Sequence, residues 1–187
     1  METRPKSDFA LTAVRSYNFY LNSEETSIVV ELVNSVASKV MIEIGCNRGH
    51  TARTLLDHVP TLERYIGVDV PFEHEPSLRA QRGEIPVEPA KHAAADKRFY
   101  LLLRSSMLIK PEDLEPCDAV FIDGDHSERA VLHDSDLARA LLRPGGIIIW
   151  HDFNNESVEV TPALHRLHSC GWPIVAVQST WLAFCKF

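Results

Sequence analysis

The sequence predicts an α/β fold, a doubly wound and mostly parallel sheet of seven strands with an antiparallel C-terminal strand. Two patterns indicate this fold. Short, continuous apolar runs, typical of strands buried on both faces, alternate with segments whose apolar residues recur at helical spacing. The last two runs, 174–179 and 181–187, are too close together for a helical crossover, so we expect them to pair antiparallel.

The predicted elements of the first third follow this alternation. A helix over 22–36 begins at Asn22, whose side chain can cap it, and Glu25 stands three residues later, as in a capping box. The next elements are a strand, a helix and a strand, at 39–45, 50–59 and 64–70. The second helix ends before Pro60, because a residue that precedes proline disfavours helical backbone.

Residues 71–97 interrupt the alternation. Prolines and a polar mixture break up the segment, so we predict an irregular insertion with one short helix near 90–96. Its length and irregularity are those of an active-site lid, although proline-rich disorder fits the composition equally well.

The remaining chain returns to alternating strands and helices. The predicted elements are strands over 98–103, 118–123 and 147–150 and helices over 127–143 and 161–169. Pro144 and the two glycines after it end the longer helix. Asp134, Ser135 and Asp136 on that helix indicate a solvated face.

Composition limits the classes of function. The 187 residues predict a single domain over 1–187, with 1–21 as an N-terminal extension. The formal net charge is −7 and no basic stripe occurs, which disfavours a nucleic-acid partner. No apolar run approaches the ~20 residues of a membrane span, and no secretory leader is recognisable. Four scattered cysteines predict reduced thiols and a cytoplasmic location.

A glycine loop follows the first predicted strand, in the stretch IEIGCNRGHT. Gly45 and Gly49 allow a sharp turn and a close approach of a ligand to the backbone, and the next helix offers free N–H groups. Asp69 ends the following strand, where a carboxylate can accept hydrogen bonds from both hydroxyls of a ribose. The loop and Asp69 together predict nucleoside binding.

Two carboxylates follow neighbouring strands further along the chain. Asp123, in FIDGDH, ends the strand over 118–123, and Asp152 follows the strand over 147–150. Adjacent parallel strands bring such side chains together, an arrangement that suits a hard divalent cation such as Mg²⁺. The same residues have a structural interpretation, because Asp123 and Asp125 can cap the next helix and Asp152 can anchor its loop.

The chain resembles a known family at these motifs. The E-x-G-x-x-x-G loop, the acid that ends the second strand and LLRPGGIIIWHD are similar to class I S-adenosylmethionine-dependent methyltransferases, which share a Rossmann-like fold, over residues 22–187. The pattern FIDGDHS to WHD resembles a small-molecule subgroup that includes macrolide-sugar O-methyltransferases and cephalosporin-hydroxylase-like enzymes.

The resemblance implies residues that bind the cofactor, S-adenosylmethionine. Those expected at its methionine half are Glu43, Gly45, Asn47 and Gly49, with Cys46 and Thr51 in the same segment and Asp123 alongside. Asp69 would hold the ribose. Ser105 would contact adenine, although the family often has an acid after this strand, where this chain has Arg104-Ser105-Ser106.

The resemblance also implies a metal site and a base. It places Mg²⁺ or Mn²⁺ ligands at Asp123, His151 and Asp152, although the family usually has a carboxylate where this chain has His151. It makes His126 the general base, a role that suits an imidazole because its pKa lies near neutrality.

The expected function is therefore metal-assisted O-methylation of a small hydroxylated molecule, a sugar or natural product. Two alternatives stay open. One is an NAD-dependent oxidoreductase, although Asn47 stands where the dinucleotide fingerprint has its middle glycine. The other is a non-catalytic, degenerate nucleoside-binding domain, which the unusual Ser105 and His151 would fit. The sequence predicts a small-molecule substrate and leaves a homo-oligomer open.

Overall fold

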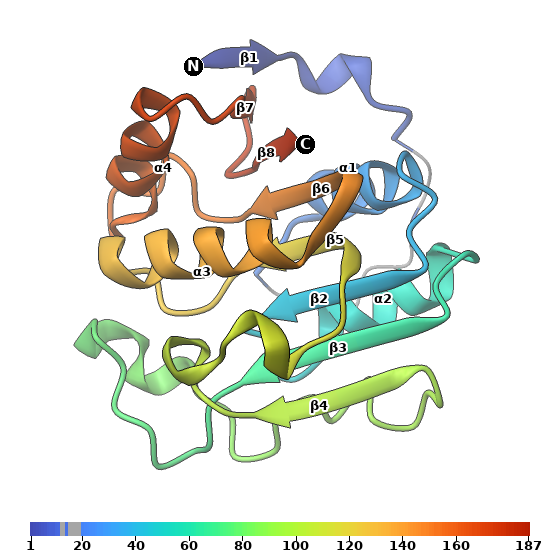
Figure 1. Cartoon of the computed structure of the whole chain (residues 1–187), viewed down its shortest axis with the longest axis vertical. Coiled ribbons are helices and arrows are strands. Elements are labelled where there is room, and N and C mark those ends of the chain that lie inside the picture. Colours follow the sequence, from blue (N-terminus) through green and yellow to red (C-terminus); the bar gives the residue numbers. More distant parts are fainter. Residues whose placement is uncertain (12–13, 15–19) are drawn as a thin grey trace.

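An eight-stranded sheet runs through the computed structural model, which describes residues 1–11, 14 and 20–187 (Figure 1). Its strand order is β1-β7-β8-β6-β5-β2-β3-β4. The strands are β1 (Glu2–Arg4), β2 (Val40–Ile44), β3 (Arg64–Asp69), β4 (Phe99–Leu103), β5 (Cys117–Ile122), β6 (Leu142–Trp150), β7 (Val175–Val177) and β8 (Ala183–Lys186). Among the described residues, every pairing is parallel except those of β8 with β6 and β7.

The predicted parallel sheet with an antiparallel C-terminal strand is confirmed, but the expected count of seven strands is one short. The N-terminal extension supplies β1, which pairs parallel with β7 at the edge of the sheet. Its residues, Glu-Thr-Arg, are mostly exposed, so pairing of the backbone forms this strand without an apolar run that the sequence could show. Residues 12–13 and 15–19 of that extension lie outside the described residues.

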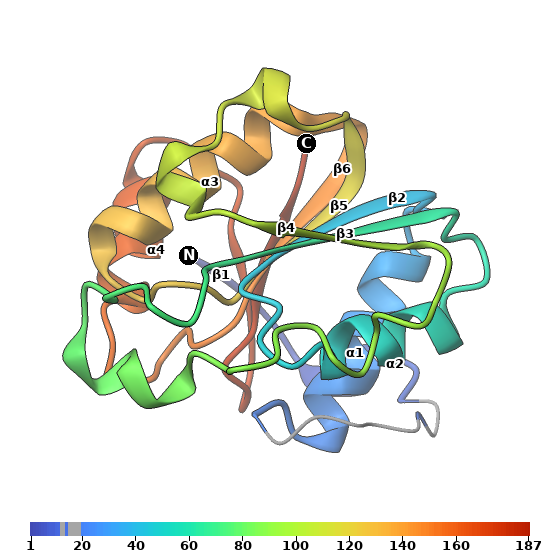
Figure 2. The same ribbon diagram turned by 90° about the horizontal axis from the view of Figure 1, so that it is seen from below.

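Within the described part of the chain, four α-helices cover the sheet, two on each face (Figure 2). They are α1 (Ser23–Asn34), α2 (His50–His58), α3 (Glu128–Leu141) and α4 (Val160–Ser169). The capping box predicted for α1 is present: the Glu25 N–H donates to Asn22 Oδ1 at 2.9 Å, and the Asn22 N–H donates to the Glu25 carboxylate at 3.2 Å. No described helix is long and apolar enough to cross a membrane.

Side chains of the central strands alternate between two cores. On β2, Met41 packs on the α1 and α2 side, whereas Ile42 packs on the α3 and α4 side. On β6, Ile149 and Trp150 divide in the same way. Because both faces are covered, these strands contain almost no polar residues, which explains why apolar runs predicted them.

The helix α3 differs from its prediction on one face. Asp134 and Ser135 are fully buried and only Asp136 is exposed, so the predicted solvated face was wrong. Ser135 is satisfied there, because its hydroxyl donates to the Val131 carbonyl and accepts from the Trp150 indole. Ser135 is therefore part of a buried hydrogen-bond network, although polar residues on a helix ordinarily indicate an exposed face.

Residues 71–97 contain one short 3₁₀ helix, η2 (Arg79–Glu84), and turns. The helix predicted near 90–96 is absent, and residues 89–95 form turns instead. Two further 3₁₀ helices, η3 (Ser106–Leu108) and η4 (Pro111–Asp113), follow β4, and another, η1 (Lys6–Asp8), follows β1.

The antiparallel direction of β8 determines where the chain ends. Its partner residues run from Trp150 opposite Ala183 to Ile147 opposite Lys186. The Gly145 N–H then donates to the Phe187 carbonyl, and the Phe187 N–H donates to the Gly146 carbonyl. The last residue therefore lies at the amino end of β6, and Trp150 lies at the other end.

Candidate active site

The glycine loop, residues 45–49, is packed directly against the loop that follows β5. Gly45 has φ = 89°, and a Cβ atom there would lie 2.1 Å from the carbonyl oxygen of Asp123. Gly49 has φ = 79° and stands at the start of α2, and a Cβ atom there would lie 3.0 Å from Ala90. Glycine is required at Gly45 for both reasons, backbone angle and space.

Glu43 lies beneath this loop, near the carboxyl end of β2, and is 1% exposed. The Tyr65 hydroxyl donates to its carboxylate at 2.9 Å, and Thr51 is a second hydrogen-bond partner. Burial raises the pKa of Glu43 to about 8. The Asp123 and Asp69 carboxylates also raise this pKa, whereas the two hydrogen bonds lower it. A cationic ligand group nearby would favour the charged form of this acid.

Asp69 ends β3 and is bound to the glycine loop. Its carboxylate accepts from the Asn47 N–H at 2.5 Å and from the Val70 N–H at 2.7 Å. Burial raises the pKa of Asp69 above its ordinary value despite these bonds. Burial also raises the pKa of the neighbouring Cys46 thiol well above its ordinary value, which favours the neutral thiol over the reactive thiolate.

A cavity of about 470 Å³ opens at the carboxyl ends of the strands. The predicted site residues that line it are Gly45, Asn47, Asp69, Ser105 and Asp123. The other predicted site residues do not line it, namely Glu43, Cys46, Gly49, Thr51, His126, His151 and Asp152. Residues 74–77, 81 and 84–86 contribute one wall, so part of the predicted insertion lines the cavity.

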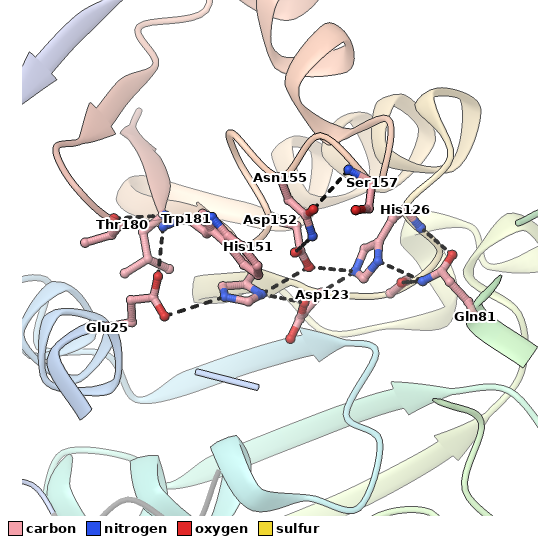
Figure 3. A network of polar contacts seen from close by, with 12 residues as sticks. Glu25, Gln81, Asp123, His126, His151, Asp152, Asn155, Ser157, Thr180 and Trp181 are labelled. Carbon is pink, nitrogen blue, oxygen red and sulfur yellow. Dashed lines mark hydrogen bonds and ion pairs between the residues drawn. The ribbon is translucent and has the colours of Figure 1, made fainter. Parts of the chain in front are cut away.

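Asp123 also belongs to a cluster with His126, His151 and Asp152, which we call the acid–histidine cluster (Figure 3). Nε2 of His126 lies 3.4 Å from Asp123 Oδ1 and 3.3 Å from Asp152 Oδ2. Nδ1 of His151 lies 3.2 Å and 3.1 Å from the same two oxygens. Two imidazoles therefore face one pair of carboxylates, as the neighbouring positions of β5 and β6 predict.

The cluster has a strongly coupled charge pattern. Burial opposes ionisation of Asp123, but His151 and His126 hold its pKa at about 2. Burial would lower the pKa of His151, yet Asp123, Asp152 and Glu25 raise it to about 12. For His126 the same two aspartates outweigh burial and raise the pKa above its ordinary value. His151 is thus the group that neutralises the two carboxylates.

The donor set fits a divalent cation. Among the described residues, Asp123, His126 and Asp152 offer one ligand atom each, all within 4.8 Å of one another. Nε2 of His126 is buried and has no hydrogen-bond partner, which leaves its lone pair or proton unsatisfied. His151, predicted as a ligand, is outside this set and directs Nδ1 toward both carboxylates.

A family model described as a methyltransferase domain matches residues 42–153, more than half of the chain. The chain belongs to this methyltransferase family. The matched region begins in β2 and ends just after β6, so it contains the glycine loop and every residue of the acid–histidine cluster. A search of curated protein sequences finds no significant match.

Solved structures share the fold of this methyltransferase. O-methyltransferase TomG from Streptomyces achromogenes, in complex with S-adenosylmethionine, is 14% identical with a TM-score of 0.59, over 89% of this chain and 81% of that chain. An O-methyltransferase from Bacillus cereus, in complex with S-adenosylhomocysteine, is 17% identical with a TM-score of 0.61, over 91% and 84%. CalS11, a TDP-rhamnose 3′-O-methyltransferase, is 15% identical with a TM-score of 0.61, over 90% and 82%.

Sequence reasoning missed two residues that contact the acid–histidine cluster of this methyltransferase. Glu25, identified only as a capping residue, places Oε2 3.9 Å from Nε2 of His151. Gln81 contacts His126 from η2. Glu25 carries a detectable signal, because a buried acid on a capped helix needs a partner, whereas nothing in the irregular segment around Gln81 marks it.

Proposed function

We propose that this methyltransferase transfers the methyl group of S-adenosylmethionine to a hydroxyl oxygen of a small molecule, a sugar or natural product. The observation that carries the proposal is Asp123, which lines the cavity beside Asp69 and also belongs to the acid–histidine cluster. A nucleoside held by Asp69 would thus place its reactive end beside a group of acids and imidazoles. The proposal is supported by three structural neighbours that are named as O-methyltransferases. One of them was solved with S-adenosylmethionine and another with S-adenosylhomocysteine.

The proposed cofactor site uses the backbone as much as side chains. Asp69 would accept hydrogen bonds from the ribose hydroxyls, and Ser105 would face adenine across the cavity. Gly45 and Asn47 would approach the methionine half through main-chain atoms, while Gly49 starts α2. Cys46 and Thr51 would support the loop from below, since neither lines the cavity.

Acids around this site favour a positively charged sulfonium. Glu43 and Asp69 are buried with raised pKa values, so each carries an electrostatic cost that a nearby cation lowers. Release of the methyl group removes that positive charge, which favours departure of the neutral product.

His126 is the proposed general base. As the oxygen–methyl bond forms and the sulfur–methyl bond breaks, the hydroxyl proton passes to Nε2 of His126, and the leaving group departs as S-adenosylhomocysteine. Asp123 and Asp152 hold the imidazole in place and stabilise its protonated form. Nδ1 of His151 lies at hydrogen-bond distance from both carboxylates and would hold them in this arrangement.

A divalent cation, Mg²⁺ or Mn²⁺, would be held by Asp123 and Asp152 and would supply a lower pKa and a fixed position for the acceptor hydroxyl. His126 is the third donor that the geometry offers, and its two roles compete for the same Nε2 atom. We assign it the base role and assign His151, expected as a ligand, to orienting the carboxylates. Loss of Mn²⁺ binding in His126→Gln would show that His126 is a ligand instead.

The segment over 71–97 is proposed as the substrate cover. Its residues 74–77 and 84–86 line the cavity, and the Ser77 N–H donates to Asp125 in the loop after β5 at 3.0 Å. Protease cleavage within this segment should fall when cofactor and acceptor are bound. Cleavage that is unchanged by both would argue against a cover.

The experiment that tests the function is calorimetric titration with S-adenosylmethionine, S-adenosylhomocysteine and NAD, with and without Mn²⁺. We expect both methionine-derived ligands to bind and NAD to give no heat. Asp69→Ala should weaken binding by about tenfold or more, since it removes hydrogen bonds to a charged group, whereas the surface variant Asp57→Ala should not. Binding without methyl transfer to any hydroxylated acceptor would support the degenerate-domain alternative.

A further inference from the structure

Gln81 makes three polar contacts with the loop that follows β5 (Figure 3). Its Nε2 lies 2.8 Å from Nδ1 of His126 and 3.2 Å from the carbonyl oxygen of Gly124. Its Oε1 accepts from the backbone N–H of His126 at 3.1 Å. Gln81 is 7% exposed, so these contacts are made away from solvent.

Two of these partners determine which way the amide points. A backbone N–H can only donate and a backbone carbonyl can only accept. The His126 N–H must therefore meet the amide oxygen of Gln81, and the Gly124 carbonyl must meet the amide nitrogen. Flipping the amide would place two donors together and two acceptors together.

The orientation of Gln81 in turn determines the role of Nδ1 in His126. Because an amide NH₂ only donates, Nδ1 must accept and carries no proton while Gln81 stays in place, so this contact opposes the rise in the pKa of His126 that Asp123 and Asp152 cause. The proton of the neutral ring is then on Nε2, the nitrogen that faces Asp123 and Asp152. That nitrogen has no lone pair to offer in this tautomer.

We propose that Gln81 is a positioning residue that decides which ring nitrogen of His126 presents a lone pair, and so whether His126 can act. The inference rests on the proposed function of His126 through Nε2. Both candidate roles there, accepting a proton and binding a metal ion, require the proton to be on Nδ1. Contact with Gln81 therefore holds His126 in the inactive tautomer, and the segment that carries η2 must release the ring before transfer.

The inference also explains why Gln81, in the proposed substrate cover, contacts the loop that follows β5. Movement of 71–97 would then change two properties together, access to the cavity and the tautomer of His126. A substrate that displaces η2 would activate the ring as it enters. Without a substrate, the Gln81 side chain would keep the proton of His126 on Nε2. The Gln81 amide is neutral and does not titrate, so a change of pH would not remove this contact.

The test is nitrogen-15 spectroscopy of the full chain labelled in its histidine rings, with the His126 signals assigned by their loss in His126→Asn. In the unliganded wild type we expect an unprotonated Nδ1 and a protonated Nε2. A protonated Nδ1 would overturn the proposal. The spectrum is independent of turnover, so it decides the role of Gln81 even if the protein proves to methylate nothing.

Two variants make the test specific. Gln81→Glu offers an acceptor to Nδ1, so Nδ1 should become protonated. Gln81→Leu removes the donor, and the tautomer ratio should shift toward protonated Nδ1 by about fivefold, the effect of one ordinary hydrogen bond. Gln178→Leu, at an exposed glutamine that contacts Thr3, is the matched control and should leave the spectrum unchanged. Wild-type spectra in both Gln81 variants would overturn the proposal.

Discussion

Nε2 of His151 lies 3.9 Å from Oε2 of Glu25, and both side chains are almost completely buried. Glu25 also accepts from the Trp181 N–H through Oε1 and completes the capping box of α1. One carboxylate therefore connects α1, the end of β6 and the turn before β8. This contact connects the acid–histidine cluster to α1, a helix none of whose residues lines the cavity.

Glu25→Gln should destabilise the fold. The amide retains hydrogen-bonding capacity but loses the charge that faces His151, and we expect the free energy of unfolding to fall by about 2 kcal/mol. Urea denaturation measures the change. Glu24→Gln is the matched control, since Glu24 is a half-exposed neighbour paired with Lys6, and it should change stability by less than about 1 kcal/mol. Equal effects of the two variants would show that Glu25 does not act through His151.

His151→Glu should strengthen metal binding. A third carboxylate replaces the imidazolium that now neutralises Asp123 and Asp152, so a cation must take its place. We expect Mn²⁺ affinity to rise by about tenfold, the equivalent of about 1.4 kcal/mol, and metal-free stability to fall. Electron paramagnetic resonance and thermal unfolding with and without a chelator measure both. His165→Glu on the exposed side of α4 is the control, and a chelator-insensitive His151→Glu would contradict the metal site.

Gly45→Ala should disrupt both loops at once. The added methyl would lie 2.1 Å from the Asp123 carbonyl, at a backbone angle that disfavours alanine. We expect stability to fall by more than about 2 kcal/mol and binding of S-adenosylmethionine to be lost. Gly83→Ala is the control, because nothing lies within 4 Å of the methyl it would add. Normal unfolding and binding by Gly45→Ala would mean that the two loops are not packed as described.

Asp134→Asn should make stability less dependent on pH. Burial raises the pKa of Asp134 to about 7, because the side-chain hydrogen bond with Ser106 offsets only part of the cost of burying the charged form. A raised folded pKa means that stability is fully present below the unfolded pKa of about 3.9 and is lost as pH rises toward 7. The substitution should therefore be more favourable at pH 8 than at pH 5, by about 2 kcal/mol.

Urea denaturation at both pH values, compared with Asp136→Asn, isolates this effect. Asp136 is exposed on the same helix, so its substitution is the control for replacing an acid by an amide on α3. The constant cost of burying an amide cancels in the difference between the two pH values. A difference near zero for Asp134→Asn would mean that this carboxyl titrates normally.

The fold follows from the sequence wherever burial and local chemistry agree. Apolar runs predict the central strands because those strands are covered on both faces, and Asn22 with Glu25 predicts the start of α1 because the capping box is local. The meeting of Asp123 and Asp152 follows from the order of neighbouring parallel strands. These inferences need no knowledge of distant contacts.

What the sequence did not show depends on partners far along the chain. β1 exists because its backbone pairs with β7, more than 150 residues away, and its side chains carry no signal. Gln81 meets His126 across 45 residues, and a glutamine in an irregular segment is ordinary there. Asp134 is buried by the packing of α3, which the alternation of residues on that helix did not reveal.

The direction of β8 has a practical consequence. Because β8 returns against β6, Phe187 is hydrogen-bonded beside Gly145 and Gly146, while the cavity lies at the opposite ends of the parallel strands. Any polypeptide joined after Phe187 would leave the molecule on the side away from the cavity. Immobilisation on a surface or fusion to a reporter at this end would therefore leave the mouth of the cavity free, and the titrations proposed above can be run on tethered protein.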